Sequence, residues 1–221
     1  MYPPVTGLAL GILGILLVTL FVIIEIGIIH AAYERLGISH RMVSILLLAM
    51  IFGSFINLPI ASVSANQIVH DQVIYFWGIP YVVPRLVRAG HTEIAINVGG
   101  ALIPFFTCVY VLIRTAPYLK TIIATAIVTL MVHHFATVVP GVGIAVPTLI
   151  PGIIAALAAS ILERRRAPAI AFIAGTLGCL IGADLMNLSQ IGQMRAPVAS
   201  IGGAGTFDGV FVSGLIAVLL A

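Results

Sequence analysis

The sequence predicts an all-α fold, a bundle of about seven transmembrane helices in a single domain over residues 1–221. Hydrophobic residues make up 61% of the chain and charged residues only 8%, whereas about 25% are charged in a soluble domain. The apolar residues fall in runs of about 20, the length a helix needs to cross a bilayer core of about 30 Å. Short basic or polar loops separate these runs. We therefore expect an integral membrane protein.

Seven apolar segments set the expected order of helices, and a count of six is the alternative. Pro147 and Pro151 interrupt the fifth segment, so a kinked or re-entrant element is expected over residues 139–151. The long connection over residues 65–93 contains β-branched and aromatic residues, which suit an outer loop, a hairpin or an interfacial flap. The expected segments are 5–30, 42–64, 94–114, 119–138, 144–162, 168–187 and 202–221.

The distribution of lysine and arginine predicts the orientation, with the N-terminus outside and the C-terminus inside, in a cell membrane. The net charge of +3 does not indicate nucleic-acid binding, because the basic residues lie in loops between apolar segments. Three arginines fall in the predicted outer loops: Arg85, Arg88 and Arg195. The predicted inner loops hold Arg35, Arg41, Arg114, Lys120 and the run Arg164-Arg165-Arg166.

Polar side chains within the apolar segments fall at one depth. Counting 1.5 Å of rise per residue from the basic ends places them about 20–25 Å away, in the outer third of the membrane. This agreement predicts one polar cavity that opens to the outside. Asn57 and Asn97 have an alternative structural role, because each lies near a proline that leaves backbone carbonyls free. The residues at this depth are Asn57, Asn97, His133, His134, Asp184 and Asp208.

Asp184 and Asp208 are the strongest functional candidates, because a carboxylate within lipid is costly and usually faces a partner or a water-filled cavity. Asp208 could instead cap the last helix. Asp184 lies near the C-terminal end of its helix, where the dipole disfavours a negative charge, so capping does not explain it. Two small-residue ridges, Ala174-Gly178-Gly182 and Gly205-Gly209, are expected to bring the two helices and their aspartates together.

No cofactor or metal is expected from the cysteine and histidine pattern. Cys108 and Cys179 lie inside apolar segments and are interpreted as packing residues. Neighbouring histidines point about 100° apart on a helix, so His133-His134 does not have a chelating spacing. A mixed site of one histidine with Asp184 and Asp208 is the alternative.

Several motifs resemble a prokaryotic multi-pass membrane family catalogued as domain of unknown function 1614. The resemblance runs from about residue 57 to the C-terminus and implies a membrane protein without supplying an activity. The motifs are Asn97-Val98-Gly99-Gly100-Ala101-Leu102-Ile103-Pro104, Pro140-Gly141-Val142-Gly143-Ile144, Gly182-Ala183-Asp184 and Ile201-Gly202-Gly203-Ala204-Gly205-Thr206-Phe207-Asp208-Gly209.

The arrangement also resembles, more distantly, the intramembrane aspartic proteases of the presenilin and signal-peptide-peptidase type. Those carry one aspartate on each of two successive helices, the second in a glycine-rich motif, with a proline element nearby. Here Ala183-Asp184 replaces the expected Tyr-Asp, and Thr206-Phe207 separates Gly205 from Asp208. The likeness is therefore one of arrangement.

Two functions follow as hypotheses. In the first, Asp184 and Asp208 form an aspartic dyad that hydrolyses a transmembrane-segment substrate, with one carboxyl protonated and the other activating water. In the second, the same aspartates bind a proton, a cation or a small polar solute in a transporter or channel. The residues expected to orient the site are Asn57, Asn97, His133, His134 and Asn187.

Overall fold

The structure is a computed structural model that describes residues 19, 22, 24–64, 73–76, 79–82, 91–139, 143–147, 149–194, 198–203 and 209–221. Helices dominate it, which confirms the prediction of a mainly helical fold. Two π-helical turns, η1 (Val98–Leu102) and η3 (Leu180–Asp184), and two 3₁₀ turns, η2 (Arg164–Arg166) and η4 (Leu185–Gln190), adjoin the α-helices. The α-helices are Ile24–Arg35, α2 (His40–Gly53), α3 (Ile103–Arg114), α4 (Tyr118–Phe135), α5 (Ile150–Leu162), α6 (Ala167–Cys179), α7 (Ile191–Met194) and α8 (Gly209–Leu220).

Within these described residues, two helical stretches are long and apolar enough to cross a membrane: Tyr118–Phe135 and Arg164–Gln190. A third is added if Ile24–Arg35 and α2, which are bent by 117°, count as one span. Helices α5 and α8 have 13 and 12 residues. At 1.5 Å per residue they rise only about 20 Å, less than a bilayer core of about 30 Å. Seven complete helical crossings are therefore not present in the described chain.

Three small sheets correct the all-α prediction. Strand β4 (His91–Asn97) pairs antiparallel with β1 (Asn57–Ser64) and parallel with β7 (Val198–Ile201), which gives the order β1-β4-β7. The segments 42–64 and 94–114 therefore contain strands where helices were expected. Hydropathy does not separate a buried strand from a buried helix. The distinguishing signal in β4 is alternation, since His91 and Glu93 are exposed while Thr92 and Ile94 are buried.

The other two sheets are hairpins. In the connection predicted over residues 65–93, β2 (Val73–Phe76) pairs with β3 (Ile79–Val82). In the interrupted fifth segment, β5 (Thr137–Val139) pairs with β6 (Gly143–Ala145). Pro151 lies in the first turn of α5, where its missing N–H leaves no bond unmade. A hairpin followed by a new helix therefore replaces the expected kink.

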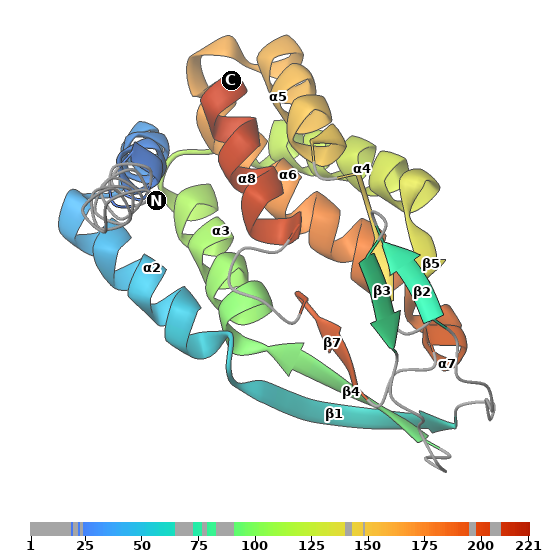
Figure 1. The fold of residues 1–221 in the computed structure, drawn as a ribbon. Coiled ribbons are helices and arrows are strands. Elements are labelled where there is room, and N and C mark those ends of the chain that lie inside the picture. Colours follow the sequence, from blue (N-terminus) through green and yellow to red (C-terminus); the bar gives the residue numbers. More distant parts are fainter. Residues whose placement is uncertain are drawn as a thin grey trace, which may run out of the picture.

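Helix α6 lies at the centre of the bundle and packs against α3, α4, α5 and α8, with the strands at one end (Figure 1). Gly178 and Gly182 of the predicted ridge face α4 rather than α8: a Cβ on Gly178 would lie 2.6 Å from Val128 Cγ1. Helix α8 meets a different face, at Gly175, where a Cβ would lie 2.9 Å from Ser213 O. The predicted pairing of the Gly178–Gly182 ridge with the last helix is therefore wrong.

Gly182→Ala tests this close approach of α4. The added Cβ would lie 2.5 Å from Thr129 O and 3.0 Å from Val132 Cβ. Overpacking of this kind destabilises by about 1–3 kcal/mol, so a lower midpoint of thermal unfolding in detergent is expected. Gly27→Ala is the matched control, because no atom lies within 4 Å of the position its Cβ would take. Equal midpoints for the two variants would contradict the α4–η3 packing.

Candidate functional site

Asn97 is fully buried at the point where strand β4 ends and the π-helical turn η1 begins. Its Oδ1 accepts a hydrogen bond from Gly100 N at 2.7 Å, which caps the turn. Its Nδ2 donates to Ser54 O at 2.8 Å and to Asn57 Oδ1 at 3.0 Å. The amide therefore joins the end of α2, the sheet and the start of η1.

Asn57 extends this network to the third strand of the sheet. It lies opposite Asn97 in the antiparallel register, and its Oδ1 also accepts from Ser200 Oγ of β7 at 2.8 Å. Sequence reasoning missed Ser200, because nothing marks a single serine in an apolar stretch as the partner of a residue 143 positions away. We name Asn57, Asn97 and Ser200 the amide network.

Asp184 is the last residue of the π-helical turn η3, and its Oδ2 accepts a hydrogen bond from Gly202 N at 2.7 Å. Gly202 has φ +85°, a conformation that favours glycine. It also lies against η1: a Cβ on Gly100 would be 1.9 Å from Gly202 O. Gly202 therefore links Asp184 to the turn that Asn97 caps. π-Helical turns are rare overall, but many of those known occur at functional sites. Here Asn97 precedes η1 and Asp184 ends η3.

Asn187 is buried one turn beyond Asp184 and stabilises the change from π-helix to 3₁₀-helix. Its Nδ2 donates to Gly182 O at 3.1 Å and Ala183 O at 2.9 Å, and its Oδ1 accepts from Gln190 Nε2 at 3.0 Å. The predicted orienting residue therefore bonds the backbone around Asp184.

The two histidines lie in the last turn of α4 and have different surroundings. His134 is exposed and lies edge to face with Phe135 at 5.3 Å between ring centroids. His133 is half-buried beside η3, since a Cβ on Gly182 would lie 3.2 Å from His133 N. Its Nδ1 is buried and has no hydrogen-bond partner among the residues that the structure describes. Of the pair, His133 is thus the one available to the Asp184 region.

Asp208 lies outside the described residues, so its distance from Asp184 and its predicted capping role stay untested. The next residue, Gly209, begins α8, and a Cβ there would lie 4.0 Å from Cys179 Sγ. Within the described ranges, no three His, Cys, Asp or Glu side chains are close enough to hold a metal ion.

A family model described as "Protein of unknown function (DUF1614)" matches residues 51–220, which include every predicted site residue. No curated protein and no solved structure matches the chain. The comparisons give no support to the likeness to intramembrane aspartic proteases.

Asn97→Ala tests whether the amide network fixes the helix–sheet junction. The substitution removes the partner of the buried Gly100 N–H and of Ser54 O. Since each buried polar group left unpaired costs about 1–3 kcal/mol, we expect a loss of about 3 kcal/mol in the free energy of unfolding. Ser200→Ala removes one partly exposed bond and should cost less than about 1 kcal/mol. Denaturant unfolding in detergent measures both, and equal losses would contradict the central role of Asn97.

Proposed function

The chain belongs to the DUF1614 family of proteins of unknown function, and we propose that it is a multi-pass membrane hydrolase with an Asp184/Asp208 dyad. The proposed orientation places the sheet and Asp184 toward the outside and the basic loops toward the cytoplasm. Large apolar side chains exposed along the outer face of α4 support a lipid environment. They include Leu119, Ile122, Ile123, Ile127 and Leu130.

The observation that carries the proposal is where the two described ends of the glycine-rich segment before α8 lie. Its described start, Gly202, bonds the Asp184 carboxylate, and Gly209 at its far end lies against Cys179. Cys179 precedes Asp184 by five positions on one helical stretch. The described residues on both sides of the Asp208 motif therefore lie near the same helical stretch, and on this ground we propose that the two carboxyls are close.

The chemistry of such a pair is general acid–base catalysis. Two adjacent carboxyls cannot both ionise easily, so together they hold one proton. The ionised carboxyl would take a proton from a water molecule while the oxygen of that water adds to the carbonyl carbon of the substrate. The protonated carboxyl would donate its proton to the carbonyl oxygen. Collapse of the resulting diol would break the C–N bond, with a proton passing to the leaving amine.

The surroundings of Asp184 favour an apolar substrate. Leu185, Met186 and Leu188 follow it directly and are 41%, 41% and 37% exposed. An apolar polypeptide segment could lie against these side chains and present its backbone to the carboxylate. A transmembrane segment of another protein is therefore the proposed substrate class.

The dyad predicts that Asp184→Asn and Asp208→Asn each abolish hydrolysis, because an amide can neither share the proton nor act as the base. The assay uses the full chain in proteoliposomes with single-span peptides that carry a fluorescent tag at the outer end. Asp71→Asn is the matched control, since Asp71 is the one aspartate of the chain outside the proposed dyad. Cleavage retained by either dyad variant would end the proposal.

A second candidate function, proton- or cation-coupled transport, is favoured by one observation. Within one helical stretch, the π-helical turn η3 ends at Asp184 and the 3₁₀ turn η4 follows it. His133, which lies close to Gly182 of η3, has a buried Nδ1 without a hydrogen-bond partner in the described chain. Interrupted helices with exposed backbone groups are typical of ion sites in transporters. The interior below the site is apolar and closely packed, which favours the one-sided hydrolase.

Transport predicts a proton flux that a pH-sensitive dye inside the proteoliposomes would record. Asp184→Asn should reduce this flux to the background of empty liposomes, and His133→Gln should slow it by about tenfold if the imidazole relays the proton. Peptide cleavage without any Asp184-dependent flux would reject the transport function and favour the hydrolase.

A further inference from the structure

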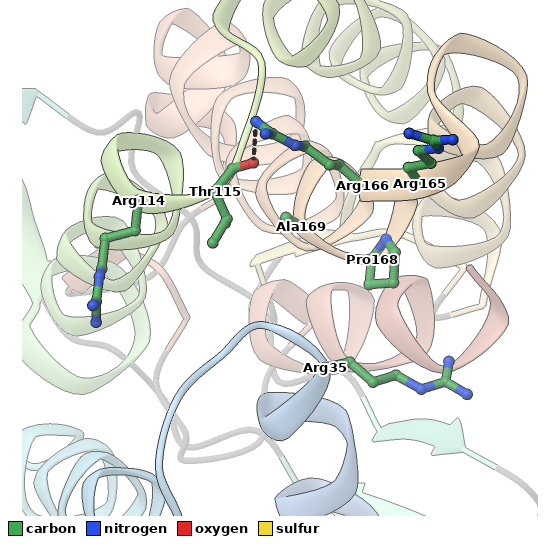
Figure 2. A pocket seen from close by; sticks show the side chains of 7 residues that line it. All are labelled: Arg35, Arg114, Thr115, Arg165, Arg166, Pro168 and Ala169. Atoms are coloured by element: carbon green, nitrogen blue, oxygen red, sulfur yellow. Dashed lines mark hydrogen bonds between the residues drawn. The ribbon is translucent and has the colours of Figure 1, made fainter.

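Four arginines from three parts of the chain line one cavity (Figure 2). The cavity has a volume of about 310 Å³. Arg35 ends the first described helix, Arg114 ends α3, and Arg165 and Arg166 form part of η2. The remaining lining residues are Thr115, Pro168 and Ala169.

The cavity is strongly positive. Guanidinium groups stay protonated at any physiological pH, and no carboxylate lines the cavity within the described chain. Two acids lie close in sequence to the lining residues. Glu34 contacts His40. Glu163 accepts from Lys120 Nζ at 2.7 Å and from Arg165 N at 3.4 Å, and these contacts hold the pKa of its carboxyl below the usual value. One carboxylate shared with Lys120 offsets only part of the positive charge of the four arginines.

Hydrogen bonds hold the arginines in place while leaving donors for a ligand. Arg166 Nη1 donates to Thr115 O at 3.0 Å (Figure 2). Arg35 Nη1 donates to Val218 O at 3.1 Å and to Leu219 O at 3.4 Å, and Arg114 Nη1 donates to Tyr110 Oη. Each guanidinium has five N–H donors, so one or two such bonds leave most of them available. Planar guanidinium groups bind phosphate oxygens in pairs, which makes phosphate the best-matched anion.

The helix dipole adds a second, independent attraction for an anion. Pro168 and Ala169 belong to the first turn of α6, whose N-terminal end carries partial positive charge. Arginines are of the wrong sign for this position, and within the described part of the chain no side chain caps the turn at Arg166. An anion in the cavity would offset both sources of positive charge.

Exposed apolar side chains lie close in sequence to the residues that line the cavity. The side chain of Ile113, directly before Arg114, is 67% exposed. Leu119, at the start of α4, is 71% exposed, and Ile161, near the end of α5, is 83% exposed. Acyl chains could contact these side chains while a headgroup reaches the arginines. We propose that the arginine cavity binds a phosphate group, that of an anionic phospholipid headgroup.

Native mass spectrometry of the full chain in detergent tests the site with short-chain phosphatidylglycerol, short-chain phosphatidylcholine and inorganic phosphate as probes. We expect preferential retention of phosphatidylglycerol. Arg165→Gln and Arg114→Gln should each weaken it by about tenfold, the effect of one charge-assisted hydrogen bond. Arg164→Gln is the matched control, because Arg164 belongs to the same run and does not line the cavity. Its affinity should stay within about twofold of the unmodified protein, since exposed charges are screened.

The outcomes separate the sources of phosphate. If millimolar inorganic phosphate displaces the lipid, the result would support a phosphate site in the cavity. It would also assign that site to soluble phosphate compounds. Equal weakening by Arg164→Gln and Arg165→Gln would overturn the proposal, because it would show general charge attraction without a site. Equal retention of phosphatidylglycerol and phosphatidylcholine would overturn it as well.

Discussion

Backbone groups that lose their helical partners in apolar surroundings must find others, and this constraint shapes the end of the bundle where the sheet lies. The helices there stop, tighten into 3₁₀ turns, widen into π turns or continue as strands. Asn97 bonds Gly100 N and Ser54 O, Asn187 bonds Gly182 O and Ala183 O, and Asp184 bonds Gly202 N. Each polar side chain thus satisfies the backbone at a change of secondary structure.

This constraint changes the meaning of the common depth predicted from the sequence. Asn57 and Asn97 lie together, as expected from their positions, but their amides bond each other and Ser200 within the amide network. They share a level because the helices end at that level. Asp184 differs from them, because a single backbone N–H is its recorded partner and a carboxylate can accept several bonds. Its carboxylate can still accept further hydrogen bonds, and for this reason Asp184 is the candidate functional residue where the helices meet the sheet.

The helices were predictable from the sequence because hydropathy and loop charge are local signals, and four of the arginines predicted for the inner loops line one cavity. The strands were not, since β4 is defined by pairing with β1 and β7, segments far from it in sequence. The contact between Asp184 and Gly202 was hidden for the same reason. The contact requires a residue with positive φ at position 202, and in the sequence Gly202 is only one of several glycines in the motif.

Helix α6 connects the two ends of the bundle, and its dipole opposes the charge found at both. Arginines stand at its N-terminal end, and Asp184 stands where the helical stretch breaks at its C-terminal end. Each arrangement is unfavourable by about 0.3–1 kcal/mol for an exposed charge, and more in partly buried geometry. At Asp184 the N–H of Gly202 offsets part of this energy, whereas the one described carboxylate near the arginines, Glu163, is shared with Lys120. A helix with unfavourable charge at both ends is explained most simply if each end binds something: a phosphate at the basic end, and at the acidic end a proton shared with a second carboxyl.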